Sequence, residues 1–229
     1  MLYSYFQFFS INRKDLSIKP KPNHRAKFKR LIGVISLGLL FLFMTLIEHL
    51  KSFYHIDDDL EIFFDSISET KEYAKGDFIF EPDSYLKHIY FIESGFTRVF
   101  YYKNKKDVTH YFFGENTFST GIESVFYEKP SFFGFQALTH SRITLLPFAP
   151  IREMSNTSIT MNHIIEKILL DNLIAFSKRF YKSQFETAQE RYAALLKENP
   201  QLLQNASLGH IASYLGVSQQ TLSVIRGMI

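Results

Sequence analysis

The sequence contains no cysteine and no tryptophan among its 229 residues. Without cysteine the chain cannot form disulfides, thiolate zinc sites or cysteine-held iron–sulfur clusters, and it has no cysteine nucleophile. A phosphate-binding glycine loop, a G-x-S-x-G nucleophile elbow and an H-E-x-x-H metal motif are also missing. These absences argue against an enzyme, so we expect no catalytic residues and no metal site.

The eight histidines are scattered, and no two of them have the i, i+4 spacing of a helical metal site. An enzyme built on a cupin-like barrel would need His and carboxylate ligands on neighbouring strands. His88 and His110 are the only candidates for such a cluster, and we keep this enzyme as one alternative to a non-enzymatic function.

Apolar residues make up 46% of the chain and charged residues 21%, which is typical of a folded protein. The 25 Phe and 13 Tyr are expected mainly in the core. The net charge of +3 is uneven, because residues 1–43 carry eight bases and one acid and therefore +7, which leaves −4 for residues 44–229. Within that body, residues 175–229 carry six bases and three acids, a local excess that favours contact with a phosphate backbone.

Residues 31–47 form an uncharged, largely apolar run between Arg30 and Glu48. This run lies at the lower length limit for a membrane-spanning helix, and the bases before it would hold the N-terminus inside. Three interpretations stay open: an inner-membrane anchor, a signal peptide without an A-x-A-like cleavage site, or a leader upstream of a true start at Met44. Either membrane interpretation would place the rest of the chain outside the cytoplasm, where the C-terminal motif described below could not act. We therefore favour the start at Met44 and a cytoplasmic protein.

From Met44 onward the pattern is that of a folded body. Amphipathic stretches at 44–53 and 57–64 predict two short helices, the second with acids at its start, where the helix dipole favours them. From Thr70 the apolar period changes to two, and turn residues separate short runs, which predicts an antiparallel β-sandwich or barrel. The strands are expected at 73–75, 78–80, 89–92, 97–102, 108–113, 132–137 and 143–147.

From about Ile159 apolar residues recur at threes and fours, through Phe176 and Phe180, which predicts one helix of roughly thirty residues. Its apolar stripe is longer than one small barrel can cover. We therefore expect a parallel two-helix seam between subunits, with packing inside one subunit as the alternative. A further helix is expected from Glu190 to Pro200, which stops it.

Two short helices are predicted at the end of the chain. Ser207 is a suitable N-cap for the first, and Gly216 suits the left-handed residue that ends it. Ser218 caps the second helix, whose Leu222 and Ile225 face the first. This pattern is typical of a helix-turn-helix, in which the second helix enters the DNA major groove; an ordinary helical hairpin with a polar outer face is the alternative. The residues expected on the DNA side are Ser218, Gln219, Gln220, Thr221, Ser223 and Arg226.

The chain resembles the Crp–Fnr family of bacterial transcription regulators, in detail the branch common in Bacteroidetes. The order of its predicted elements is the same: a helical entry, a β-barrel, a long helix and a helix-turn-helix. The segments 75–80, 90–95, 190–192 and 211–226 carry the resemblance, which covers about residues 44–229. It implies an α+β fold with an antiparallel β-barrel or jelly-roll sensor domain, a long dimerisation helix and a small C-terminal helix-turn-helix domain. The expected division is a leader of doubtful status at 1–43, a cyclic-nucleotide-binding-like barrel at 44–158, the dimerisation helix at 159–189 and the DNA-binding domain at 190–229.

Cyclic AMP receptors of this family hold the ribose with a Gly-Glu pair and the phosphate with an Arg-Ser or Arg-Thr pair. In the matching segment Gly121 is kept, but Glu123 comes one position late, and 130–133 supply no arginine where one is needed. Lys129 is out of register as a substitute, and a cyclic phosphate needs a fixed cation. We therefore expect no cofactor and no cyclic nucleotide. The residues expected near an effector pocket are Gly121, Glu123, Lys129 and Ser131.

The sequence thus predicts a homodimeric, sequence-specific DNA-binding regulator whose barrel senses an unidentified signal. The resemblance implies a palindromic site in double-stranded DNA, and RNA polymerase is a further partner that it allows. Val224 stands where relatives often carry a base-contacting arginine, and no basic tail follows it. The alternative is a membrane-anchored or ligand-binding sensor whose DNA-binding end is degenerate.

Overall fold

The computed structural model describes residues 44–228, so the proposed leader at 1–43 lies outside the described residues. Most of the apolar run at 31–47 lies outside them as well. Within 44–228, no helix combines the length and the apolar character that a membrane span requires.

The described chain begins with two short helices whose starts are capped by side chains. Thr45 and Glu48 form a reciprocal capping box at the start of α2 (Leu46–Lys51). The carboxylate of Asp57 accepts a hydrogen bond from the amide of Leu60 in the first turn of α3 (Asp58–Ile67). Both predicted helices are therefore confirmed.

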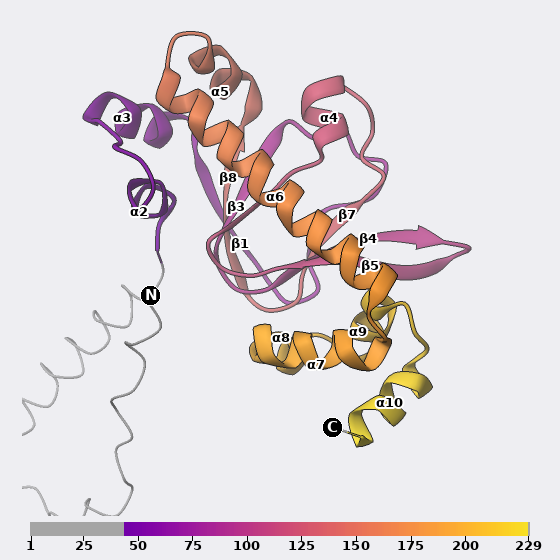
Figure 1. The fold of residues 1–229 in the computed structure, drawn as a ribbon. Coiled ribbons are helices and arrows are strands. Elements are labelled where there is room, and N and C mark those ends of the chain that lie inside the picture. Colours follow the sequence, from indigo (N-terminus) through magenta and orange to yellow (C-terminus); the bar gives the residue numbers. More distant parts are fainter. Residues whose placement is uncertain (1–43, 229) are drawn as a thin grey trace, which may run out of the picture. The chain divides into compact units, whose positions relative to one another are not determined.

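Two four-stranded antiparallel sheets follow (Figure 1), as the alternating pattern predicts. One sheet has the strand order β1-β8-β3-β6 and the other β2-β7-β4-β5, so neighbours in each sheet come mostly from distant parts of the sequence. The strands are β1 (Glu69–Tyr73), β2 (Phe78–Phe80), β3 (His88–Ser94), β4 (Thr97–Lys103), β5 (Lys106–Phe113), β6 (Thr117–Ser119), β7 (Gly134–Ala137) and β8 (Ser141–Pro147).

Four elements in this part differ from the sequence prediction. The first strand lies at 69–73 and not at 73–75, because β1 is an edge strand of mostly exposed polar residues that pairs with β8 alone. The short strand β6 was not predicted. The helices α4 (Ile122–Tyr127) and α5 (Phe148–Ser155) were not predicted either, since neither has a side-chain cap and α4 ends at Glu128, a left-handed residue that is not glycine.

The space between the sheets is filled by a mainly aromatic and β-branched core. Phe135 and Ile143, one from each sheet, have no exposed surface. A second core lies where α2, α3, α5 and the start of α6 pack against the sheet that contains β3, with Phe91 at 0% exposure. Some of the Phe and Tyr residues thus form the core, but others, such as Phe132 and Phe176, are exposed, so the expectation that the aromatic residues lie mainly in the core holds only in part.

The long helix α6 (Ile159–Phe185) starts at Ser158, whose hydroxyl accepts from the amide of Met161. It runs past the barrel towards the C-terminal helices (Figure 1). Only its first turns are deeply buried, at Met161 and Ile164. The remaining helices are α7 (Ala188–Glu198), α8 (Pro200–Asn205), α9 (Leu208–Leu215) and α10 (Gln219–Gly227).

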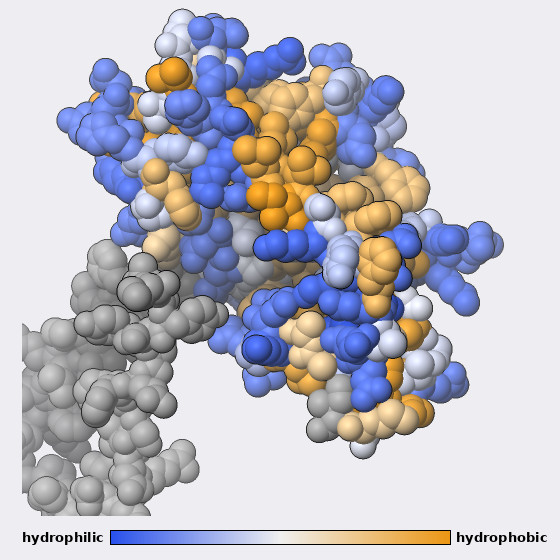
Figure 2. All heavy atoms as spheres, viewed as in Figure 1, coloured by the Kyte–Doolittle hydropathy of each residue, from blue (hydrophilic) through white to orange (hydrophobic). Residues whose placement is uncertain are grey.

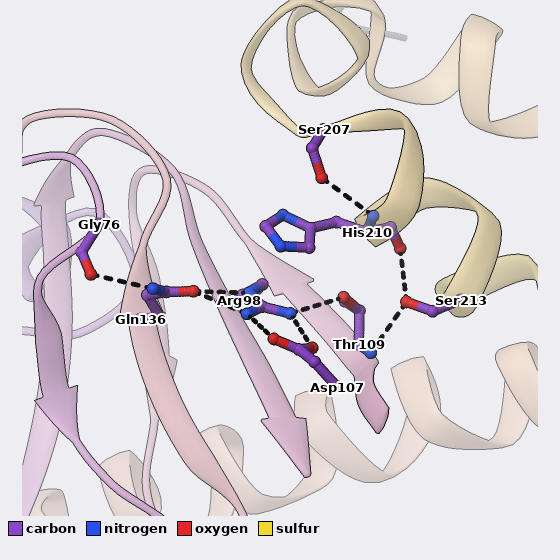
Figure 3. A network of polar contacts seen from close by, with 8 residues as sticks. All are labelled: Gly76, Arg98, Asp107, Thr109, Gln136, Ser207, His210 and Ser213. Atoms are coloured by element: carbon purple, nitrogen blue, oxygen red, sulfur yellow. Dashed lines mark hydrogen bonds and ion pairs between the residues drawn. The ribbon is translucent and has the colours of Figure 1, made fainter. Parts of the chain in front are cut away.

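A buried arginine links the barrel to the C-terminal helices. Arg98 on β4 is 2% exposed, and its guanidinium makes two contacts of 2.5 Å with the carboxylate of Asp107. It also donates to Gln136 and to the hydroxyl of Thr109 on β5. The amide of Thr109 donates in turn to Ser213 on α9 at 3.0 Å (Figure 3). The ion pair therefore stabilises the strand on which α9 rests.

A second set of contacts, beside the Arg98 network, joins β5, α6 and α9. Arg179 on α6 approaches Nδ1 of His110 on β5 at 3.4 Å, and its guanidinium lies 4.8 Å from the ring centroid of Tyr214 on α9. Tyr214 also packs against Phe112 of β5, with ring centroids 5.0 Å apart. The helix α9 is thus held to the barrel by polar, aromatic and cation–π contacts.

Removing the charge of Asp107 should destabilise this arrangement, because Arg98 would be left as a buried cation without its anion. We expect Asp107→Asn to lower the free energy of unfolding by about 2–3 kcal/mol, less than for a fully buried pair since the Asp107 side chain is 38% exposed. Urea unfolding followed by circular dichroism measures it. The control is Asp65→Asn at an exposed position of α3, expected within about 0.5 kcal/mol of the parent. Equal losses in the two variants would contradict the role given to Arg98.

The junction also predicts a pH dependence of stability. Burial, with a smaller contribution from Arg179, lowers the pKa of His110 from 6.5 to about 4. Below pH 6.5 the unfolded chain therefore binds a proton that the native chain resists, so stability present at pH 7 is lost as the pH falls towards 4. We expect His110→Gln to show a smaller loss between pH 7 and pH 5 in urea unfolding, and His55→Gln, at an exposed position, to match the parent. An unchanged loss in His110→Gln would show that other groups control it.

Candidate nucleic-acid interface and sensor cavity

The final helix α10 is set at a fixed angle to α9 by a short capped turn. Gly216 takes φ +70°, a left-handed conformation that favours glycine, and ends α9. The hydroxyl of Ser218 then accepts from the amide of Thr221 at 3.0 Å and lies 2.8 Å from its hydroxyl. Both caps were predicted from the sequence and are confirmed.

One face of α10 is buried and the other is polar and exposed. Leu222 is 0% exposed and Ile225 7%, and both pack with Ile211 and Leu215 of α9. Val224 is 57% exposed and belongs to the outer face. The structure places all six residues predicted to contact DNA on that face as exposed residues: Ser218, Gln219, Gln220, Thr221, Ser223 and Arg226.

Gln219 differs from its neighbours on this face because its side chain lies back over α9. The Gln219 Nε2 lies so near Gly209 that a Cβ built there would come within 2.8 Å of it. Gln219 is thus an exposed residue of the outer face, as predicted, whose amide lies close to the start of α9.

Arg191 supports this pair of helices from α7. It donates to the carbonyl of Leu215, the last residue of α9, at 2.8 Å, and to the carbonyl of Glu186. These carbonyls lie at the C-terminal ends of helices, where a cation is favourable. The Glu-Arg-Tyr segment at 190–192 thus has a positional role that its sequence did not reveal, with Glu190 in the capping box of α7 and Tyr192 in the core.

A cavity of about 360 Å³ lies between the barrel and α6. We call it the sensor cavity. Its walls come from β4, β5, β6 and α4 on the barrel side and from one side of α6. The residues that line it are Val99, His110, Tyr111, Phe113, Phe118, Ser119, Thr120, Ile122, Glu123, Phe133, Ile168, Leu169, Asn172, Leu173, Ala175 and Phe176.

Of the four predicted effector residues, Glu123 lines this cavity and the other three do not. Gly121 is buried below α4, where a Cβ would come within 2.6 Å of Leu86. Ser131 is 1% exposed, and its hydroxyl donates to the carbonyl of Phe133 and accepts from the amide of that residue. Lys129 is exposed in the turn after α4. The structure therefore does not bring the four residues together as one site.

Sequence reasoning missed most of the cavity wall. His110 and Phe133 stack with ring centroids 4.5 Å apart, although 23 residues separate them in the chain. The aromatic residues were expected as core, and no local signal distinguishes those that face the cavity. Among residues 44–228, no group of three His, Asp or Glu side chains is close enough together to hold a metal ion.

Comparison with known proteins gives one family match and several structural ones. Residues 70–158 match the family model of the cyclic nucleotide-binding domain. No curated protein matches the chain at a significant level. The match to the solved structure of FixK2 from Bradyrhizobium japonicum has a TM-score of 0.60 at 16% identity and covers 71% of this chain and 84% of that one.

Two further solved structures are similar. The c-di-GMP-responsive global regulator CLP from Xanthomonas campestris matches with a TM-score of 0.61 at 14% identity, over 75% of this chain and 91% of that one. TTHA1359, a CRP/FNR-family transcriptional regulator from Thermus thermophilus, matches with a TM-score of 0.58 at 18% identity, over 70% of this chain and 84% of that one. At these identities the likeness concerns the fold.

These matches confirm the α+β fold class and the resemblance drawn from the sequence. Residues 70–158 match the cyclic nucleotide-binding domain model, and the chain shares its fold with a solved transcriptional regulator of the CRP/FNR family.

Proposed function

We propose that this protein is a homodimeric, sequence-specific DNA-binding transcription regulator in which α9 and α10 form a helix-turn-helix and α10 reads the major groove. The observation that carries the proposal is the division of α10 into a buried apolar face and an exposed polar face. Leu222 and Ile225 fix the helix on α9, and the amide, hydroxyl and guanidinium groups lie outside. A helix presented in this way fits the major groove.

The side chains of α10 suit base and phosphate contacts. A glutamine amide can pair with adenine N6 and N7, and an arginine with guanine O6 and N7, so Gln219, Gln220 and Arg226 are the base-reading candidates. The hydroxyls of Ser218, Thr221 and Ser223 would be shared between phosphates and bases, near the start of a helix whose dipole favours anions. Gln219 would have to turn away from Gly209 to reach a base.

The contact between the barrel and the C-terminal helices leaves α10 available. β5 contacts α9 through Ser213 and Tyr214, and neither residue belongs to α10. The polar face of α10 can therefore meet DNA while α9 stays on the barrel. If the barrel is the sensing domain, as we propose, it is in direct contact with the proposed DNA-binding helices.

The second half of α6 carries the surface proposed for the homodimer. Leu169, Leu173, Phe176 and Phe180 follow the 4-3-4 spacing of a coiled-coil seam. Leu173 is 60% exposed, Phe176 54% and Phe180 57% in the single chain. Figure 2 shows apolar side chains gathered along this helix. A second copy packed on the stripe would bury these rings and would place two α10 helices on a palindromic site.

Double-stranded DNA as the partner implies a cytoplasmic protein, and RNA polymerase is a partner that such a regulator could also contact. The structural neighbours reported above are regulators and not enzymes, which supports a non-enzymatic function. The competing proposal is a sensor with a degenerate DNA-binding end. The exposed Val224 favours it, because an apolar side chain on the outer face offers no hydrogen bond to a base.

In vitro DNA selection with the full chain tests sequence reading. We expect enrichment of a palindrome, and we expect Gln219→Ala and Gln220→Ala each to lose about 1–3 kcal/mol of discrimination at one base pair of each half-site. The matched control is Gln204→Ala, an exposed glutamine on α8, which should select the parent sequence. Unchanged preference in both α10 variants would refute the assignment, and no enrichment from a folded dimer would favour the degenerate end.

Sedimentation velocity tests the dimer seam. We expect Phe176→Glu and Phe180→Glu to raise the dimer dissociation constant at least about tenfold each, because each places a charge in a buried apolar seam. The control is Lys178→Glu. Lys178 lies on the same turns of α6, but it lines a cleft between α6 and α9. Dimers of parental stability in both Phe variants would show that the subunits associate through another surface.

A further inference from the structure

The sensor cavity contains no cationic side chain. Ten of the sixteen residues that line it are apolar, and none is Lys or Arg. Its one carboxylate is Glu123, at the α4 rim. The cavity volume of about 360 Å³ lies near the lower end of the range for small-molecule sites. The size of the cavity thus suits a small ligand, and its charge disfavours an anionic one.

The positions that could have supplied a cation are otherwise engaged. Ser131, in the segment where the sequence lacks the arginine, makes its hydrogen bonds to the backbone of Phe133. Phe132 and Phe133 follow it, and both stack on Tyr101, with centroids 5.3 and 6.0 Å apart. Aromatic rings therefore occupy the segment that would have to bind a phosphate. An anion buried without a partner costs several kcal/mol.

The nearest basic group, Arg179, does not supply the cavity with a positive charge. Arg179 approaches the cavity residue His110, but its guanidinium lies over Tyr214 and lines an adjoining cleft towards α9, on the other side of His110 from the lining listed above. His110 is itself neutral at pH 7, because burial and Arg179 hold its pKa at about 4. If Arg179 donates to Nδ1, the ring proton lies on Nε2, which can donate one neutral hydrogen bond. Asn172 donates its amide to the carbonyl of Ile168 and keeps its own oxygen as an acceptor.

We propose that the sensor cavity binds an uncharged, largely apolar molecule of one or two rings, and not a cyclic nucleotide. The lining offers aromatic faces, aliphatic groups and a few neutral hydrogen-bonding groups, which is the chemistry that such a molecule requires. The proposal rests on the proposed function only in treating the barrel as the sensing domain. It deepens that function by naming the class of signal.

The cavity wall connects to both proposed output surfaces. Leu173 and Phe176 line the cavity and also belong to the apolar stripe of α6, so a bound ligand would change the packing of the dimer seam. His110 contacts Arg179, whose guanidinium rests on Tyr214 of α9. A ligand against His110 would therefore act on the contact that holds the DNA-binding helices.

A matched pair of fluorescent probes tests the charge preference on the full chain. N-phenyl-1-naphthylamine is neutral, and 8-anilinonaphthalene-1-sulfonate has nearly the same ring system with one negative charge. We expect saturable binding of one neutral probe per subunit, at least about tenfold tighter than the anionic probe, a difference of about 1.4 kcal/mol. Cyclic AMP at millimolar concentration should not displace the neutral probe. Displacement by cyclic AMP, or tighter binding of the anionic probe, would overturn the proposal.

An arginine introduced at the cavity rim locates the site. Ile122 lines the cavity and is 44% exposed, so Ile122→Arg should fold and should reverse the preference towards the anionic probe. The control is Ile62→Arg, the same substitution at a 66% exposed position of α3 outside the cavity. Equal effects of the two variants would show that the probe binds elsewhere, for example on the stripe of α6, and would refute the assignment.

The two proposals fail in different ways. DNA selection measures the C-terminal helices without added ligand, and probe binding measures the cavity without DNA. A protein that selects no DNA but keeps the probe preference and its reversal in Ile122→Arg would refute the regulator and retain the ligand class. A protein that selects a palindrome but binds cyclic AMP in this cavity would do the opposite.

Discussion

The burial of Arg98 is the constraint on which the arrangement of the two halves depends. A guanidinium that is 2% exposed requires an anion and further hydrogen-bond acceptors, and Asp107 and Thr109 on β5 and Gln136 on β7 supply them. These contacts of Arg98 fix the β4–β5 hairpin. The hydrogen bond from the amide of Thr109 to the hydroxyl of Ser213 then places α9 on that hairpin. The imidazole of His210 lies beside the same group, and burial together with Arg98 lowers its pKa. One buried charge thus organises both sides of the contact.

The long helix α6 contacts the barrel core, the sensor cavity and α9 in turn. Its first turns belong to the barrel core, its middle closes the sensor cavity, and Arg179 near its end meets α9. Its outer side keeps large apolar side chains exposed, a cost that a second subunit would remove. A single helix therefore takes part in the cavity, the proposed dimer and the contact with the C-terminal helices, and this would be the physical basis for the proposed coupling of a ligand to DNA binding.

The barrel shares its fold with the cyclic nucleotide-binding domain, but the ligand class proposed for its cavity is different. Residues 70–158 match the cyclic nucleotide-binding domain, and the barrel and α6 still enclose a cavity. Glu123 is the only charged side chain among the lining residues, and aromatic residues stand at 132 and 133, so the lining offers a phosphate no cation. The fold depends on apolar packing and strand order, which tolerate this change, whereas the ligand class depends on a few polar atoms.

Local signals in the sequence determined the element order, most strand positions, and the caps at Ser207, Gly216 and Ser218, since periodicity and capping act within a few residues. They also placed the polar face of α10, because Leu222 and Ile225 fix its rotation. They did not reveal β1, whose polar edge has no apolar period, or the short uncapped α4 and α5. Only the tertiary structure decided that Glu123 faces the cavity and Ser131 does not, that His110 meets Phe133 and Arg179, and that α9 rests on β5. Those contacts join residues 20 or more positions apart, where pairing follows from strand order and packing and not from local sequence.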